Sequence, residues 1–173
     1  LSKIHQQVLH GGKPGPTTRA ALRAHFLRHQ TTQAMAEYII RNSQASSASR
    51  VLFIDEQLPL QADYLSVLTL IGLKEIFGSK CEVMQPVEYI YQDSQIDTTN
   101  LYGRGFGYTK LLPAELRSPS ERQTATIGTS VLDPSLQDLV IVGSLYRNQK
   151  AFSQALIDFP NDRIVALYGE DTP

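Results

Sequence analysis

The chain has 173 residues, of which 42% are hydrophobic, and its formal net charge is -1. This length and hydrophobic content fit one globular domain with its own core, and no apolar run approaches the roughly 20 residues that cross a bilayer. The single cysteine, Cys81, excludes an internal disulfide, which favours a cytoplasmic protein over a secreted one.

Charge is divided unevenly along the chain. Residues 1–50 carry seven Lys or Arg against the single acid Glu37, a net +6, and the remaining residues carry nine bases and sixteen acids, a net -7. Such a split is typical either of a nucleic-acid or membrane arm, or of a basic helix that packs on an acidic domain. Because no aromatic stacking motif accompanies the arginines, the second alternative is favoured and nucleic acid is not an expected partner.

The first predicted element is a helix that begins at Pro16 and continues to about Arg41. Proline suits the first turn of a helix, and Thr17 or Thr18 can cap it. At about 100° per residue, an apolar side forms opposite a polar stripe; its members are Ala20, Ala24, Leu27, Met35 and Tyr38. The following SQASSAS segment is typical of a linker, so residues 1–49 are predicted to be a basic helix and linker preceding an α/β domain at residues 50–173.

That domain begins with a predicted strand–helix–strand unit. Val51–Ile54 is a short apolar strand, residues 62–77 form a helix that Gly78 ends, and residues 81–84 form the next strand. This order within a short segment predicts a right-handed parallel crossover. Small residues along one side of the helix would permit close packing: Ser66, Thr69 and Gly72.

A long irregular region then spans residues 87–137, and such regions in compact domains are usually functional or disordered. Order returns with apolar strands at Leu139–Val142 and residues 164–167, joined by a helix at residues 150–157. Unbroken apolar strands are typical of a parallel sheet that is covered on both faces. The alternation predicts an α/β fold, a doubly wound, mainly parallel, Rossmann-like sheet preceded by an N-terminal helix.

Candidate site residues follow the strands, because ligands of open α/β sheets bind beyond the carboxyl ends of the strands. The candidate catalytic carboxylates are Asp55, Glu56, Glu170 and Asp171. Gly143 and Ser144 would let backbone amides approach an anion, which Arg147 would neutralise. The alternative is that these are the polar residues that end strands in any soluble α/β protein.

The stretch LYGRGFGYTKLL, residues 101–112, offers a second set of ligand-binding candidates: Gly103, Arg104, Gly105 and Tyr108. Glycine amides could meet a phosphate together with Arg104 or Lys110. The aromatic residues Tyr102, Phe106 and Tyr108 could stack on a sugar or a base. Its position in the long irregular region predicts a mobile lip over the carboxyl end of the sheet. The alternative is a glycine-rich loop whose aromatic residues pack locally.

Several common sites are absent from the sequence. The first strand is followed by IDEQLP instead of a dinucleotide fingerprint, and HGGKPG lacks the spacing of a phosphate-binding loop, so no cofactor is expected. His25 and His29 have a metal-compatible spacing but no third ligand nearby, so no metal site is expected either. Cys81 is predicted to be a packed core thiol.

Three segments together resemble a known family. VLFIDEQLPLQADYLSVLTLIGLKEIFG resembles the first strand and helix of bacterial glycosyltransferase-like proteins with two Rossmann-like domains, the GT-B-type architecture, including the CgeB-type spore-maturation group. LYGRGFGYTKLL and the segment from DLVIVGSLYRNQKAF to RIVALYGED resemble later parts of the same amino-terminal domain. The resemblance covers residues 50–173.

The resemblance implies that residues 50–173 form the acceptor-side domain of a longer enzyme, with a second domain after Pro173 that binds most of a nucleotide-sugar donor. One of the carboxylates would then act as general base on an acceptor hydroxyl, and Arg104 or Arg147 would stabilise the diphosphate leaving group. The isolated domain would be inactive. The competing hypothesis is a non-catalytic α/β module for protein interaction or regulation, whose basic N-terminal helix docks to a protein partner.

Overall fold

The computed structural model describes residue 13, residues 15–123 and residues 134–169. Within these residues, four strands form one parallel sheet in the order β2-β1-β3-β4. The strands are β1 (Val51–Ile54), β2 (Cys81–Val83), β3 (Leu139–Val142) and β4 (Ile164–Ala166). The register places Val51 opposite both Cys81 and Leu139. The predicted α/β, doubly wound, Rossmann-like fold is confirmed.

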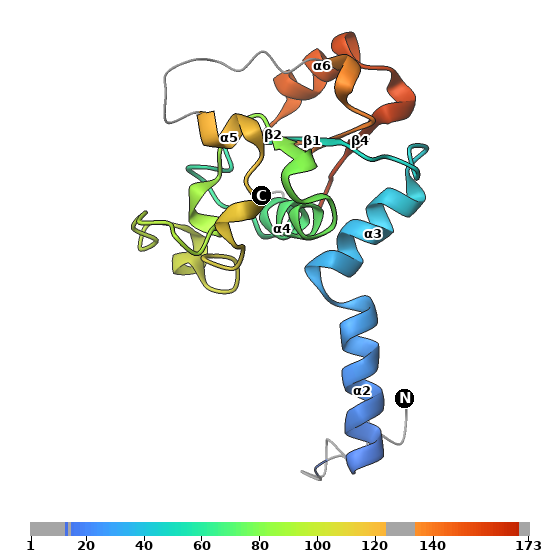
Figure 1. Ribbon diagram of the computed structural model, residues 1–173, viewed down its shortest axis with the longest axis vertical. Helices are drawn as coiled ribbons and strands as arrows, with labels where there is room; N and C mark the ends of the chain where they lie inside the picture. Colours follow the sequence, from blue (N-terminus) through green and yellow to red (C-terminus); the bar gives the residue numbers. More distant parts are fainter. Residues whose placement is uncertain (1–12, 14, 124–133, 170–173) are drawn as a thin grey trace.

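Helices cover both faces of the sheet, as Figure 1 shows. Helix α4 (Tyr64–Phe77) and α3 (Thr32–Asn42) lie on one face, and α6 (Gln149–Asp158) lies on the other. Because successive strand residues point to opposite faces, Phe53 belongs to the core under α4, and its neighbour Leu52 belongs to the core under α6. Four-residue strands that are buried throughout explain why the sequence shows no polar alternation.

The direction of winding reverses between β1 and β3. Helix α4 leads from β1 outward to β2, whereas α6 leads from β3 outward to β4 on the other side of the sheet. The carboxyl ends of β1 and β3 therefore flank the topological switch point, where ligands of this fold class bind. Helix α4 points its N-terminus at this edge, since it begins directly after the β1 loop; Asp63 caps it by accepting a hydrogen bond from the Ser66 amide at 2.8 Å.

The predicted N-terminal helix is present, but it is not one continuous helix. The structure contains two helices, α2 (Pro16–His29) and α3, which are separated at Gln30 and Thr31. Thr31 starts the second helix because its hydroxyl accepts the Ala34 amide at 3.1 Å, which competes with continuation of the first helix. The predicted threonine cap of the first helix is also absent; the capping position is Gly15, which has no side chain to bond.

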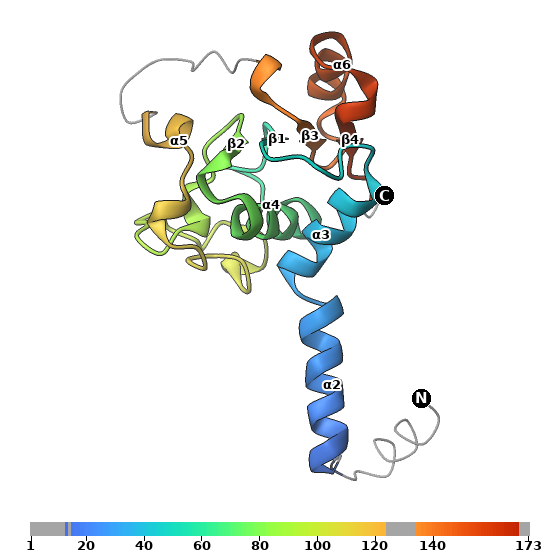
Figure 2. The same ribbon diagram turned by 45° about the vertical axis from the view of Figure 1, so that its right-hand side comes forward.

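Helix α3 belongs to the packed layer, and α2 does not. Ala36 is 0% exposed in the core between α3 and α4, and Gly72 of α4 lies directly under the Thr32 carbonyl. The segment after α3 is fixed to the sheet by Asp138, whose carboxylate accepts from the amide and hydroxyl of Ser49 at 2.9 and 2.8 Å. Helix α2 has no buried residue and projects from the domain (Figure 2). The apolar side predicted for the helix is therefore not a buried face.

The long irregular region is largely ordered by its tyrosines. Tyr89, Tyr91 and Tyr108 are at most 1% exposed, and the Tyr89 hydroxyl donates to the Leu58 carbonyl at 2.7 Å. Within residues 87–123 and 134–137 the structure shows short helical turns and one parallel bridge, between Tyr91 and Leu112. Those turns, and two more near β2 and β4, are η1 (Gly78–Lys80), η2 (Glu88–Ile90), η3 (Tyr102–Gly105), η4 (Ala114–Leu116), α5 (Pro119–Gln123), η5 (Pro134–Leu136) and η6 (Asn161–Arg163).

A buried ion pair ties this region to the sheet. The ammonium of Lys74 on α4 contacts the carboxylate of Glu121 on α5, and both side chains are 0% exposed. Glu121 also accepts from the Tyr91 hydroxyl and from the Ser118 amide, each at 2.7 Å. Lys74 donates in addition to the Cys81 carbonyl at 2.6 Å. Each charge is thus compensated by hydrogen bonds as well as by its partner.

Burial of Cys81 predicts a loss of stability in alkali. Burial raises the pKa of its thiol from the ordinary value of 9.0 to about 12. Between these values the unfolded chain releases the thiol proton and the folded chain keeps it, so the free energy of unfolding falls by up to about 1.4 kcal/mol per pH unit from this group. Urea unfolding at several pH values above 8 measures the slope.

The Cys81→Ala variant is the control, and its slope should be shallower than that of the wild type. Buried Tyr89 and Tyr91, whose pKa values burial also raises, supply the slope that remains. In the folded wild type the thiol should resist a water-soluble disulfide reagent. Rapid modification under native conditions would contradict the buried position of Cys81.

Candidate functional site

A cleft of about 500 Å³ opens at the switch point. It collects residues from four parts of the chain: the start of α4, the irregular region, the loop after β3 and the segment after β4. The lining residues are Ala62, Asp63, Tyr64, Leu65, Tyr102, Ser144, Arg147 and Gly169. The structure thus brings Ser144 and Arg147, two residues predicted from their place after β3, into one site.

Asp55 and Arg147 form an ion pair at the base of this site. Arg147 Nη2 donates to Asp55 Oδ2 at 2.8 Å, and the Asp55 side chain is 0% exposed. The other carboxylate oxygen accepts the amides of Gln57 and Leu58, each at 3.2 Å. Both oxygens are therefore engaged, and Asp55 does not line the cleft. The geometry of Asp55 therefore fits the role of positioning Arg147. It does not fit the role of general base that the sequence predicts.

Arg147 is correspondingly less available to an anion than the sequence suggests. Its second amino group donates to the Gln61 carbonyl at 2.7 Å, and the Asp55 carboxylate balances its charge. Its side chain is 14% exposed, and its buried Nε has no hydrogen-bond partner among the described residues. A diphosphate at this point would have to compete with Asp55 for the guanidinium.

Asn148, which the sequence analysis does not single out, holds the loops of β1 and β3 together. Its amide nitrogen donates to the Gly143 carbonyl at 2.7 Å, and its amide oxygen accepts from the Glu56 backbone at 3.1 Å. Asn148 is 2% exposed. Glu56 is exposed and is not part of the cleft lining. The predicted catalytic role of Glu56 thus gains no geometric support.

Gly143 and Ser144 have distinct roles. A Cβ on Gly143 would lie 2.7 Å from Ser66 Oγ and 2.9 Å from the Phe53 ring, so only glycine fits between β3 and α4. Ser144 adopts φ 37°, a left-handed conformation that is costly for serine. It is 2% exposed, and its hydroxyl finds no hydrogen-bond partner in the described part of the chain. A strained residue that holds an unpaired buried hydroxyl beside an open cleft points to a ligand.

Asp63 and Tyr64 are site residues that sequence reasoning missed. Asp63 Oδ1 caps α4, and no hydrogen bond reaches its second oxygen from the described residues. The Tyr64 hydroxyl donates to the Phe106 carbonyl at 3.1 Å, which anchors the glycine-rich stretch at the cleft. The sequence analysis begins this helix at residue 62, so it neither identifies Asp63 as the cap nor places it beside the strand ends; an aspartate at a helix start is a common cap and by itself indicates no site.

The glycine-rich stretch borders the cleft through Tyr102, one of the three aromatic residues predicted to stack on a ligand, and not through its glycines or Arg104. Gly103, Arg104 and Gly105 have φ values of 57°, 55° and 77°, which form a tight turn. Arg104 is exposed and does not line the cleft. Tyr102 does line it, is 66% exposed, and meets the Tyr64 ring edge-on at 5.5 Å. Of this stretch, Tyr102 is thus the residue that faces the cleft.

Tyr108 lies in the core, so for this residue the structure agrees with the alternative of local packing and not with stacking on a ligand. Its ring is 0% exposed and contacts Tyr64 and Tyr89 edge-on, with centroid distances of 5.4 and 5.7 Å. Its hydroxyl donates to the Tyr102 carbonyl at 2.6 Å. No face of the ring is free for a ligand, because its neighbours in the irregular region bury it. The remaining predicted carboxylates, Glu170 and Asp171, lie outside the described residues.

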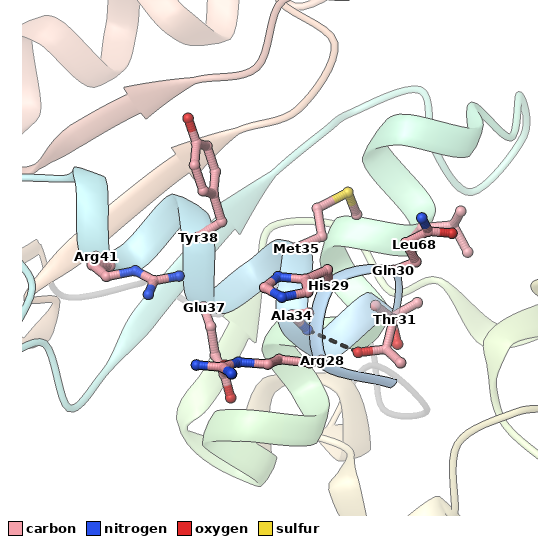
Figure 3. Close-up of a pocket in the computed structure, with 11 residues that line it drawn as sticks. Arg28, His29, Gln30, Thr31, Ala34, Met35, Glu37, Tyr38, Arg41 and Leu68 are labelled. Atoms are coloured by element: carbon pink, nitrogen blue, oxygen red, sulfur yellow. Dashed lines mark hydrogen bonds between the residues drawn. The ribbon is translucent and has the colours of Figure 1, made fainter. Parts of the chain in front are cut away.

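A second hollow of about 570 Å³ lies at the elbow between α2 and α3 (Figure 3). Its polar lining side chains, among them Arg28, Glu37 and Arg41, are all exposed or half-buried. Figure 3 draws a single hydrogen bond there, the Thr31 cap. No lining group is both buried and unpaired within the described chain. The elbow is therefore a groove beside a projecting helix, and the switch-point cleft is the better candidate site despite its smaller volume.

Comparison with protein-family models, curated proteins and solved structures finds no match to this chain. In the described residues, no three His, Cys, Asp or Glu side chains are placed to hold a metal ion; His25 and His29 stand 4.7 Å apart on exposed α2 without a third ligand. None of the helices in residues 15–123 and 134–169 is long and apolar enough to cross a membrane. The assignment of function thus depends on the geometry of the cleft.

Proposed function

We propose that this chain is the acceptor-side domain of a glycosyltransferase-like enzyme, which moves a sugar from a nucleotide-sugar donor to an acceptor hydroxyl. The acceptor binds in the switch-point cleft. The observation that carries this proposal is the buried hydroxyl of Ser144, which has no hydrogen-bond partner among the described residues and lines the cleft beside Arg147. A buried hydroxyl is costly unless it is hydrogen-bonded, and a hydroxyl-rich ligand supplies the missing partner.

The charges of the cleft favour a neutral ligand. Asp55 balances Arg147, and the other described ionisable lining groups are the acid Asp63 and the phenols Tyr64 and Tyr102. A cleft without net positive charge discriminates against phosphate groups. This supports an acceptor in the cleft and leaves the donor diphosphate to a second domain, as the family resemblance implies.

The aromatic lining suits a sugar ring. Tyr102 and Tyr64 present an edge-on pair of rings at the cleft, with Tyr102 largely exposed. Pockets that orient small ligands combine such apolar surfaces with a few fixed polar groups. In this cleft the fixed polar groups are the Ser144 hydroxyl and the Asp63 carboxylate. A sugar would stack on the tyrosines and direct its hydroxyls toward these two.

Asp63 is the carboxylate placed to act as general base. Its capping oxygen is held by the Ser66 amide, which fixes the orientation of the other oxygen. In the transfer step the acceptor oxygen bonds to the anomeric carbon of the donor, the bond from that carbon to the diphosphate breaks, and the acceptor proton passes to Asp63. The diphosphate leaves with the electron pair of the broken bond.

The Ser144→Ala variant separates ligand binding from stability. We expect it to weaken binding of neutral sugars at least about tenfold, as for loss of one hydrogen bond to a buried group. The same change should raise the free energy of unfolding by about 1 kcal/mol, because it removes a buried polar atom that has no partner in the described chain. Saturation-transfer NMR with glucose, galactose and N-acetylglucosamine, and urea unfolding, measure the two effects.

Ser66→Ala is the matched control. Ser66 is 0% exposed and its hydroxyl is also unpaired among the described residues, but it does not line the cleft. It should gain stability without any change in sugar binding. The proposal fails if wild-type protein shows no saturation transfer to any of the three sugars, or if uridine diphosphate binds in the cleft in preference to them.

A non-catalytic interaction module is the second candidate function. The observation that favours it is α2, a helix of 14 residues that projects from the domain and buries no side chain. This candidate does not exclude the first, because α2 and the cleft share no residue.

A further inference from the structure

Helix α2 needs a covering surface. An isolated helix of this length is marginal in water, and most helix stability in proteins comes from packing of one face. Yet α2 has no buried residue, and Leu22, Phe26 and Leu27 are 43%, 53% and 56% exposed. Its main contacts within the described chain are those with α3 at the elbow, and the rest of the helix projects from the domain (Figures 1 and 2).

One side of α2 combines apolar and basic residues, and we call it the arm stripe. Leu22 and Phe26 are four residues apart and so lie on one face, and Arg19 and Arg23 are their neighbours on that face. All four side chains are exposed. The helix contains no acidic residue, so its charge is unopposed locally. The arm stripe suits an apolar patch flanked by carboxylates.

Such a patch exists on this chain at the end of α6. Leu156 and Ile157 are 43% and 78% exposed, and the carboxylates of Asp158 and Asp162 follow at the exposed surface. Both views show α2 and α6 at opposite ends of the molecule, so α2 cannot reach the α6 patch of its own chain (Figures 1 and 2). With a length of about 21 Å, α2 extends far enough from its domain to meet another molecule.

We propose that the arm stripe of one molecule docks on the α6 patch of a second copy, and that two copies lying antiparallel exchange arms around a twofold axis. Each molecule then gives one arm and receives one, which closes the assembly. The charge split of the chain, +6 in residues 1–50 against -7 in the rest, drives the encounter. This inference deepens the second candidate function and is independent of the cleft.

The test is sedimentation velocity on the full chain. Wild type should dimerise with a dissociation constant on the order of 10 µM, as for small interfaces, and should dissociate in about 0.5 M salt, where exposed charges are screened. R19E/R23E should weaken the dimer at least about tenfold. The control K80E/K110E makes the same change in net charge at two exposed lysines outside both the arm stripe and α6, and it should stay dimeric.

A charge swap identifies the receiving surface. Adding D158R/D162R to R19E/R23E restores opposite charges across the proposed contact and should restore the dimer. A monomeric wild type overturns the proposal, as does a dimer that R19E/R23E leaves intact or a swap that restores nothing. A monomer that binds a single-stranded oligonucleotide through Arg19 and Arg23 also overturns it and makes α2 a nucleic-acid arm. R19E/R23E should bind sugars as the wild type does. A negative result for the dimer can therefore be distinguished from a negative result for sugar binding in the cleft.

Discussion

Replacing Lys74 by methionine is expected to lower the free energy of unfolding by about 3–5 kcal/mol, the usual cost of removing one partner of a buried ion pair. The Lys74 ammonium and the Glu121 carboxylate are both 0% exposed. Methionine fills much of the volume of lysine. Among the described residues it leaves the Glu121 charge with the Tyr91 hydroxyl and the amide and hydroxyl of Ser118 as partners. Urea unfolding monitored by tyrosine fluorescence measures the loss.

The double variant Lys74→Met/Glu121→Gln distinguishes an unpaired charge from poor packing. The glutamine oxygen still accepts from Tyr91 or Ser118, and no charge remains buried, so most of the lost stability should return. Asp93→Asn is the exposed control. It removes one carboxylate from Arg117, which keeps Glu88, and it should leave the unfolding midpoint unchanged. If the single and double variants were equally unstable, the ion pair would not be the cause.

The sheet is the part of the fold that the sequence predicts well. Val51–Ile54 and Leu139–Val142 are strands with the predicted bounds, because continuous burial makes both segments uninterrupted apolar runs. The end of α4 is predicted equally well, since Gly78 adopts φ 58°, which favours glycine. These elements are set by local periodicity and by single capping residues.

The N-terminal helices and the irregular region depend on distant contacts instead. The break at Gln30 is unremarkable in sequence, and it becomes meaningful only when α3 packs on α4 at Gly72. Tyr108 resembles a surface aromatic in a glycine-rich loop, but Tyr64 and Tyr89, from elsewhere in the chain, bury it. Local pattern cannot reveal contacts between segments that far apart.

In the candidate site, too, some residues could be predicted from local sequence and others depend on distant contacts. The rule that ligands bind beyond strand ends places Ser144 and Arg147 at the cleft, and the structure confirms that both line it. The pairing of Arg147 with Asp55, which lies 92 residues earlier, could not be predicted, although it changes the expected ligand from an anion to a neutral molecule. Asp63 lies well beyond Ile54, the end of β1, so the rule that selects residues directly after the strands does not reach it.

The small-residue side of α4, predicted from the sequence, turns out to serve both the cleft and the N-terminal layer. At one end Ser66 lies under Gly143, where a Cβ would come within 2.7 Å of the serine hydroxyl oxygen. At the other end Gly72 admits the backbone of α3. Close approach at both positions fixes β3 and α3 against α4. The position of α2, which follows from that of α3, and the shape of the cleft therefore both depend on the packing of α4.

The Gly72→Ala variant tests the packing of α3 on α4, because the sign of the change in the free energy of unfolding depends on it. In an unpacked helix alanine is about 1 kcal/mol more favourable than glycine. In this protein the added Cβ would lie 2.1 Å from the Thr32 carbonyl oxygen and 3.0 Å from Ala36 Cβ. The contact is with backbone, so α3 must move away from α4. We expect a net loss of about 2–3 kcal/mol in the free energy of unfolding, as for overpacking in a core.

Gly15→Ala is the matched control, because nothing lies within 4 Å of a Cβ at that position. Gly15 caps only α2, which buries no residue, so global unfolding followed by the core tyrosines should not change. A stabilised Gly72→Ala variant would show that the Thr32 carbonyl of α3 does not lie against Gly72 of α4. The position of α2, which is connected to the domain through α3, would then also be wrong.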